Sequence, residues 1–243
     1  MRGRTRLTAI GATALAAAWG WASVSDALES SAAGMKTIRD RAGRPAASRA
    51  AALPPPNFGR SVDIGLISGV VGVRPAHGIP FTLTPRDRNI PVGSEINTVR
   101  GAVDLRTAKA GSLGKPGAGI QDGHFSGGTF TIVQRPRQDG LAVLTLLGRA
   151  PTRALCPSES QGSAARRELS GQVLARLRSN VHGQFRTRGA YSAATARGTE
   201  WEMVDRCDGT LTRVYRGVVA VLDFRTGKTT MVTAGHTYLA PAR

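Results

Sequence analysis

Residues 199–239 read TEWEMVDRCDGTLTRVYRGVVAVLDFRTGKTTMVTAGHTYL, and this stretch decides the fold class. It contains five short runs rich in β-branched and aromatic residues, at 199–204, 210–216, 218–224, 229–233 and 237–239. The segments between the last three runs, at 225–228 and 234–236, have the composition of hairpin turns. Because connections this short suit only antiparallel neighbours, the stretch predicts an antiparallel meander.

The sequence upstream continues the same pattern. Short β-type runs, separated by Gly, Pro, Asn and Asp, occur at 61–67, 69–74, 81–84, 95–98, 102–107, 125–134 and 141–147. In one of them Val103 and Leu105 share a face while Asp104 and Arg106 share the other, which is typical of a half-buried strand. The sequence therefore predicts an all-β fold, a compact sandwich or roll of short antiparallel strands. We expect its large aromatic side chains to lie in the core: Phe185, Tyr191, Trp201, Tyr215 and Phe224.

One segment departs from this pattern and predicts an inserted helix. Ser163 stands where an N-cap belongs, and apolar residues recur after it at helical spacing: Leu169, Val173, Leu174, Leu177 and Val181. Such a stripe most commonly packs on a sheet, although a basic amphipathic helix can also bind a membrane surface.

The N-terminus has the order of an export signal. Arg2, Arg4 and Arg6 precede an uncharged apolar run at 7–21, and small residues suited to a signal peptidase follow. We predict a signal peptide at 1–27, with the mature chain starting near Ser23 or Leu28; an uncleaved anchor is the alternative. Residues 28–57, rich in Ala, Arg and Pro, read as a disordered linker, and 58–243 as the β domain. No later run approaches the roughly 20 apolar residues of a membrane span, so none is expected after cleavage.

Charge points to the class of partner. The formal net charge is +17 and the sequence pI is about 11.5, which favours anionic polymers such as those of a cell wall or surface. Compositional enrichment of arginine without any partner is the alternative. A focused patch would combine six arginines on and beyond the predicted helix: Arg166, Arg167, Arg176, Arg178, Arg186 and Arg188.

The chain has two cysteines, Cys156 and Cys207. In an exported protein such a pair predicts one disulfide, and two buried free thiols are the alternative.

Catalytic signals are weak. The four histidines lie in turn-like, Gly-containing sequence without metal-ligand spacing, so no metal or cofactor is expected. His124 and Ser126 would share a strand face, but the sequence indicates no third group to orient the histidine. Glu200 and Glu202 would also share a face, where surface ion pairs are the expected role. Aromatic residues make up 5% of the chain, which argues against specific binding of nucleic acid by stacking. We therefore predict that the chain is not an enzyme.

Several glycine-anchored elements resemble a FecR-like domain. GVVGVR at 69–74, IPVGS at 90–94 and the run at 98–105 resemble its first half. ATARGTEW at 194–201, RGVVAV at 216–221 and TAGH at 233–236 resemble its second half, in the family's order. The runs at 185–199 and 205–212 are also similar to a group of exported actinobacterial proteins. Gly198 and Gly217 each open a β run in this pattern, where a positive φ would require glycine.

The resemblance implies an exported β domain spanning about residues 68–239, with 135–182 as an insertion outside the family core. FecR-type regulators add a cytoplasmic sigma-binding segment, and nothing before the apolar run resembles it. The leading hypothesis is a non-enzymatic exported module that binds an anionic wall polymer or an envelope protein. The alternatives are the sensory domain of a FecR-type sigma-regulatory system and, less favoured, a hydrolase.

Overall fold

A computed structural model describes residues 55–86, 88–109, 119–152, 154–156 and 171–242. The predicted signal peptide at 1–27, most of the predicted linker, and Arg166 and Arg167 lie outside these residues. No helix in this described part has the length and apolar character needed to cross a lipid bilayer.

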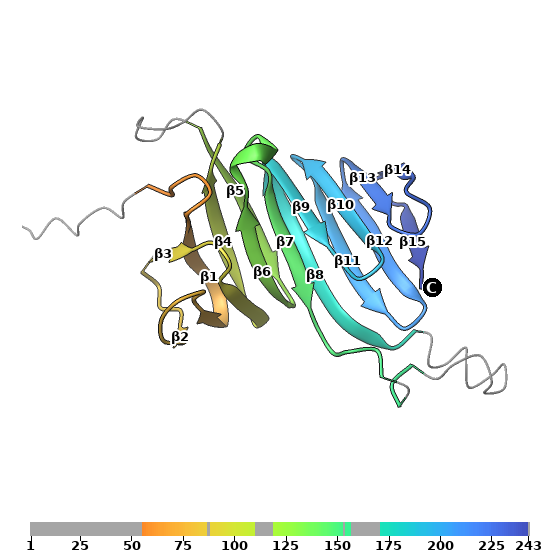
Figure 1. The fold of residues 1–243 in the computed structure, drawn as a ribbon, viewed down its shortest axis with the longest axis horizontal. Coiled ribbons are helices and arrows are strands. Elements are labelled where there is room, and N and C mark those ends of the chain that lie inside the picture. The colour runs from red at the N-terminus through yellow and green to blue at the C-terminus, as the bar shows by residue number, and fades with distance from the viewer. Residues whose placement is uncertain (1–54, 87, 110–118, 153, 157–170, 243) are drawn as a thin grey trace, which may run out of the picture. The chain divides into compact units, whose positions relative to one another are not determined.

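The described residues form a single sheet (Figure 1). Its strands are β1 (Ser61–Arg74), β2 (Phe81–Thr82), β3 (Arg88–Pro91), β4 (Glu95–Ala108), β5 (Ile120–Ser126), β6 (Thr129–Gln134), β7 (Ala142–Leu147), β8 (Val173–His182), β9 (Gln184–Arg188), β10 (Ser192–Arg197), β11 (Glu200–Arg206), β12 (Gly209–Arg216), β13 (Val218–Asp223), β14 (Thr229–Thr233) and β15 (Thr237–Pro241). A 3₁₀ turn, η1 (Pro136–Gln138), precedes β7. The predicted all-β class is confirmed.

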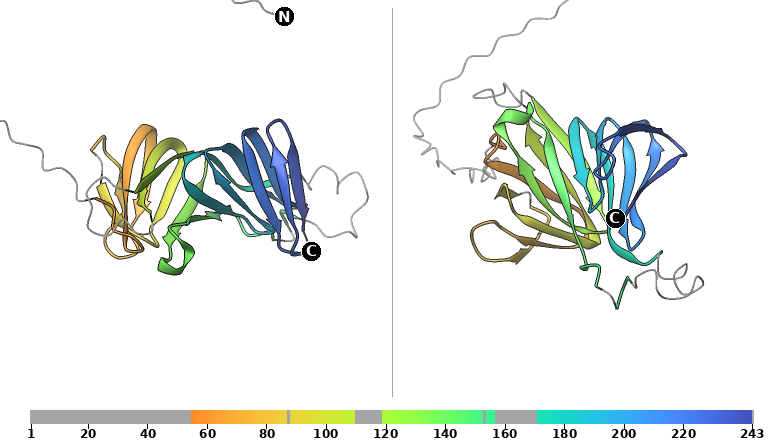
Figure 2. Two further views of the ribbon diagram at one scale, coloured as in Figure 1. Left: turned by 90° about the horizontal axis from the view of Figure 1, so that it is seen from above. Right: turned by 45° about the vertical axis from the view of Figure 1, so that its right-hand side comes forward.

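Twelve strands follow one hydrogen-bonded path, in the order β14-β13-β10-β9-β7-β6-β4-β5-β8-β11-β12-β15. The path curls into a nearly closed barrel, and β1 joins it along β4 while also pairing with β2 and β3. All pairs are antiparallel except β7 with β9, which is parallel. Figure 2 shows the N-terminal strands, orange to green, beside the C-terminal strands, cyan to blue.

The sheet divides where β5 passes into β6. Both strands pair with β4 on one side, at Ala102↔Ser126 and Asn97↔Thr129. On their other side β5 pairs with β8, whereas β6 pairs with β7. Gly127 and Gly128 form the bend between the two strands, and Thr98 binds it by donating from its amide to the Gly128 carbonyl at 2.7 Å.

The inward face of the curled sheet buries one hydrophobic cluster, to which both the N-terminal and the C-terminal strands contribute. Phe125 lies at its centre, with ring centroids 5.8 Å from Phe130 and 5.6 Å from Phe185. Phe185 and Trp201 are fully buried, as predicted. Tyr215, also expected in the core, is instead 38% exposed because it lies on the outer face of β12.

The predicted helix is wrong over residues 173–181, which belong to β8. Arg176, Arg178 and Asn180 point outward from this strand. The residues between and beside them are buried: Ala175, Leu177, Ser179 and Val181. This two-residue period is that of a strand with one buried face. The residues proposed to begin the helix, from Ser163 to 170, lie outside the described part.

The predicted meander is correct in its strands and only partly correct in their pairing. The hairpins β11–β12 and β13–β14 form as predicted. In contrast, β12 pairs with β15 and β13 pairs with β10, so the turn at 234–236 is not a hairpin. Gly217 is the one residue between β12 and β13 and has φ +79°. There the chain passes from β12, which pairs with β11 and β15, to β13, which pairs with β10 and β14.

The predicted disulfide is confirmed. It joins Cys156, beyond β7, to Cys207 in the β11–β12 turn, with 5.2 Å between the two Cα atoms. The segment at 135–182, which the family pattern sets apart, contributes β7 and β8, and each of them has strand neighbours on both sides.

Alanine at Gly217 is expected to lower the melting temperature more than alanine at Gly198. Both glycines have the predicted positive φ, +79° and +66°, so each substitution strains the backbone by about 1–2 kcal/mol. A Cβ at Gly217 would also lie 2.6 Å from Cγ2 of the buried Thr199, whereas Gly198 faces open space. Thermal unfolding followed by circular dichroism measures the difference. Equal melting temperatures for the two variants would show that Thr199 moves away from the new methyl group without loss of stability.

Candidate anion-binding site

A groove of about 290 Å³ lies on the outer face of β6, β7, β9, β10 and β13. Three of the residues that line it are arginines, Arg135, Arg186 and Arg188. The others are polar or apolar: Val133, Gln138, Val143, Thr145, Ala193, Leu222 and Phe224. We refer to this hollow as the arginine groove.

The sequence of β9 accounts for two of these arginines. In QFRTR the side chains of Phe185 and Thr187 are fully buried, so Arg186 and Arg188 must project from the opposite face. Pairing places Val143 of β7 and Thr195 of β10 on either side of Arg186. Short side chains on both neighbouring strands leave the space above the sheet that the groove occupies.

Contacts with the neighbouring elements orient both guanidinium groups. The Nε atom of Arg186 donates to Oγ1 of Thr195 at 2.8 Å. The guanidinium of Arg188 lies over the ring of Phe224, 4.7 Å from its centroid. Both contacts leave the terminal guanidinium nitrogens able to bind a ligand, since five N–H donors are present on each arginine.

The arginine groove is strongly positive. Among the described residues no carboxylate lines it, and none lies within ion-pair distance of Arg135, Arg186 or Arg188. Arginine stays protonated at all physiological pH values, so three positive charges face one hollow without compensation. Such an arrangement attracts anions and holds phosphate or carboxylate groups through paired hydrogen bonds.

A second hollow of about 360 Å³ continues from the arginine groove along β9 and β10. The two share Arg186 and Gln138, and the second adds Arg197, Gln184 and one acidic residue, Asp139. Arg197 is exposed at the end of β10, directly beside Gln184 of β9.

The buried carboxylate of Asp205 holds the turn that follows β9 through hydrogen bonds. Both oxygens of Asp205, on β11, accept from the amide of Ala190 at 3.0 Å, in the turn that follows Arg188. Thr210 donates to the same carboxylate and accepts from the amide of Tyr191 at 3.0 Å. Burial raises the pKa of Asp205, and these hydrogen bonds act in the opposite direction.

Of the six arginines predicted as one patch, the four described ones lie on two strands that do not pair with each other. Arg176 and Arg178 lie on β8, which pairs with β5 and β11, whereas Arg186 and Arg188 lie on β9, which pairs with β7 and β10. Arg166 and Arg167 lie outside the described residues.

An acidic neighbour compensates the charge of Arg178 on β8. Arg178 donates to Glu200 of β11 at 2.6 Å, and this hydrogen bond raises the pKa of Arg178. The same guanidinium lies 4.5 Å from the centroid of Tyr215, whose hydroxyl donates to Glu202. The surface role predicted for Glu200 is therefore confirmed.

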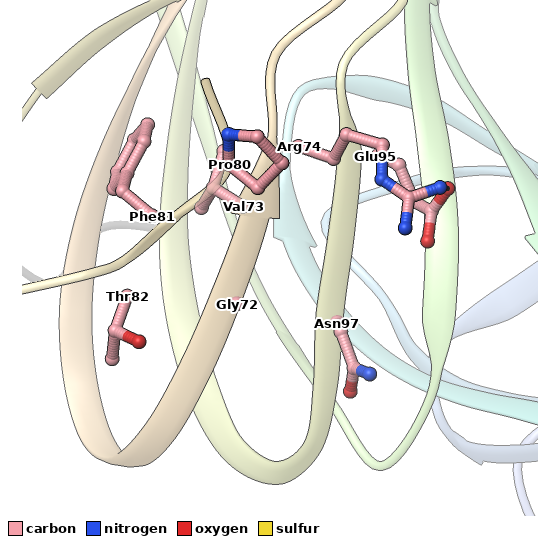
Figure 3. A pocket seen from close by; sticks show the side chains of 8 residues that line it. All are labelled: Gly72, Val73, Arg74, Pro80, Phe81, Thr82, Glu95 and Asn97. Atoms are coloured by element: carbon pink, nitrogen blue, oxygen red, sulfur yellow. Dashed lines mark ion pairs between the residues drawn. The ribbon is translucent and has the colours of Figure 1, made fainter.

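A further hollow of about 400 Å³ lies over β1, β2 and β4 (Figure 3). Its charged residues are Arg74 and Glu95, which point toward each other with 3.5 Å between Nη1 and Oε2. Because the two charges cancel, this hollow offers no net attraction to an anion.

The two catalytic candidates of the sequence, His124 and Ser126, both lie on β5. His124 and Ser126 share the outer face of β5, and the described residues show no hydrogen bond between them. His124 lies 3.7 Å from Oδ1 of Asp104, and His182 lies 3.2 Å from Oδ2 of Asp122. Within the described ranges no three His, Cys, Asp or Glu side chains gather closely enough to hold a metal ion.

Sequence reasoning identified Arg186 and Arg188 and missed Arg135, Arg197 and Phe224. The first two were proposed for their place just beyond the predicted helix, and the alternation in QFRTR puts both on one strand face. The other three come from the residue after β6, from β10 and from the β13–β14 turn, and only the pairing of distant strands brings them to β9.

No family model, curated protein or solved structure matches this chain. Functional interpretation of the groove therefore rests on its own geometry and charge.

Proposed function

We propose that this protein is an exported, non-enzymatic module that binds an anionic wall or surface polymer through the arginine groove. The observation that carries the proposal is the convergence of Arg135, Arg186 and Arg188 on one hollow whose described lining contains no carboxylate.

The setting of these arginines favours binding. The apolar side chains of Val143, Leu222 and Phe224 form part of the groove wall and reduce the local dielectric response, which strengthens attraction to an anion. Arginine is weakly hydrated for a cation, so its desolvation opposes binding less than that of lysine. The net charge of +17 adds long-range attraction that speeds encounter with a polyanion.

Export is supported by the order of charged, apolar and small residues at 1–27 and by the resemblance to a FecR-like exported domain. The disulfide between Cys156 and Cys207 agrees with an oxidising compartment.

Changing Arg186 and Arg188 together to glutamine is expected to weaken binding to long-chain polyphosphate, used as a test polyanion, at least tenfold. The plot of log affinity against log salt should lose about two units of slope, one for each phosphate contact removed. Fluorescence anisotropy of labelled polyphosphate over a range of salt concentrations measures both quantities.

The matched control is the pair Arg176→Gln and Arg213→Gln, which removes the same charge from the exposed face of β8 and β12. This control variant should bind long-chain polyphosphate within about twofold of the wild-type affinity and keep most of the slope of log affinity against log salt. Equal weakening by both pairs would mean that scattered charge binds the polymer. Absence of binding by the wild-type protein at low salt would overturn the proposed function.

A further inference from the structure

We propose that the ligand of the arginine groove is a linear polymer carrying a phosphate at each short repeat, laid along β9 from Arg188 to Arg197. This inference rests on the proposed function and adds the class of polymer and its direction on the protein.

The spacing of the arginines indicates a repeating ligand. Arg186 and Arg188 are two residues apart on the same face of β9, a distance of about 6.6 Å along the strand. Arg197 pairs with Gln184, which lies another two residues in the same direction. The Cα atoms of the three arginines therefore fall at successive steps of about 6.6 Å along the direction of β9, with Arg197 on the neighbouring strand β10.

The hollows follow the same line. The arginine groove and the second hollow adjoin, since both are lined by Arg186 and Gln138, and together they extend from Arg188 to Arg197. Arg135, just beyond β6, adds a fourth positive charge to the groove. Among the described lining residues one carboxylate stands against these four arginines, that of Asp139 in the second hollow. A single phosphate ion would use only part of this array.

The lining favours a phosphate polymer over an acidic polysaccharide. Sugar rings bind on open aromatic faces, and Phe224, the one aromatic residue in the described lining of the two hollows, carries the guanidinium of Arg188 on its ring. The remaining wall offers small apolar surfaces at Val133, Val143 and Leu222, suited to short linkers between charged groups. Planar guanidinium groups bind phosphate oxygens in pairs.

A linear array predicts that affinity depends on chain length. Once one phosphate is bound, the next phosphate of the same chain is held close to the next arginine at a high effective concentration. Affinity should therefore rise steeply until the chain spans the array, and increase only slowly with longer chains.

The experiment measures competition with labelled long-chain polyphosphate by orthophosphate, tripolyphosphate, long-chain polyphosphate and polygalacturonate at equal concentrations of charge. For the wild-type protein we expect each lengthening of the phosphate chain to improve competition at least tenfold, and polygalacturonate to compete at least tenfold less well than long-chain polyphosphate. Arg197→Gln should weaken long-chain polyphosphate about tenfold and change tripolyphosphate less than threefold. Arg176→Gln is the control of equal charge, and the melting temperature of each variant verifies folding.

The outcomes separate this inference from the proposed function. If orthophosphate competes as well as tripolyphosphate, the groove is a site for an isolated anion, and the linear arrangement is wrong while anion binding stands. If polygalacturonate competes as well as long-chain polyphosphate, the assignment to phosphate is wrong. If Arg197→Gln behaves like Arg176→Gln, the path along β9 is wrong. If labelled polyphosphate does not bind the wild-type protein, both proposals fail.

Discussion

Replacing Gly128 by alanine is expected to destabilise the protein by at least about 3 kcal/mol, because the new methyl group has no room. An ideal Cβ at this position would lie 1.7 Å from the backbone carbonyl oxygen of Arg176 and 3.7 Å from the Cα of Leu177. A main-chain atom inside a paired strand cannot rotate away as a side chain can. β8 would have to separate from the bend between β5 and β6, where the sheet divides.

The adjacent Gly127 supplies the control. Its φ of +80° makes alanine unfavourable by about 1–2 kcal/mol, but the nearest atom to a new Cβ is Cδ of Arg176, at 3.9 Å. Equilibrium unfolding in urea measures both variants, with soluble yield as a second reading for a protein that fails to fold. If the two variants lose equal stability, the close approach of Gly128 to β8 does not exist in solution.

Changing Cys156 and Cys207 together to alanine is expected to lower the free energy of unfolding by about 4 kcal/mol. The bond closes a loop with a sequence separation of 51 residues, and the chain-entropy relation gives this magnitude for a loop of that length. The effect acts mainly on the unfolded chain, which gains conformational freedom when the cross-link is lost. Urea unfolding should therefore show a lower midpoint.

Anion binding is the internal control for this pair of substitutions. The arginine groove lies over β6, β7, β9, β10 and β13, whereas the disulfide joins the segment beyond β7 to the β11–β12 turn. Affinity for long-chain polyphosphate should change less than twofold under conditions where the variant is folded. Unchanged stability would contradict the prediction and indicate that the bond is absent in solution.

Local patterns in the sequence were enough to predict the all-β class and most strands, whereas the disulfide followed from the cysteine count in a chain expected to be exported, and the positive φ of Gly198 and Gly217 from the resemblance to a FecR-like domain. Alternation and turn composition are properties of a few neighbouring residues, so they can be recognised without knowledge of the fold. The same reasoning failed at β8, because Leu174, Leu177 and Val181 satisfy a helical spacing while Ala175, Leu177 and Val181 satisfy a strand period. With apolar residues at so many positions, both periods fit the segment, and pairing with β5 and β11 decided between them.

Pairing between strands other than the β11–β12 and β13–β14 hairpins, and with it the candidate site, was decided by the tertiary structure alone. The sequence places β12 and β13 next to each other in a meander, yet the single residue between them, Gly217, joins strands that pair elsewhere, β12 with β15 and β13 with β10. By the sequence alone, Arg186 and Arg188 belong to a basic region that includes Arg176 and Arg178. Pairing of β9 with β7 and β10 instead places them with Arg135, Arg197 and Phe224, and pairing of β8 with β11 gives Arg178 an acidic partner. Which arginines remain uncompensated depends on contacts between residues far apart in the chain, and no local period records those contacts.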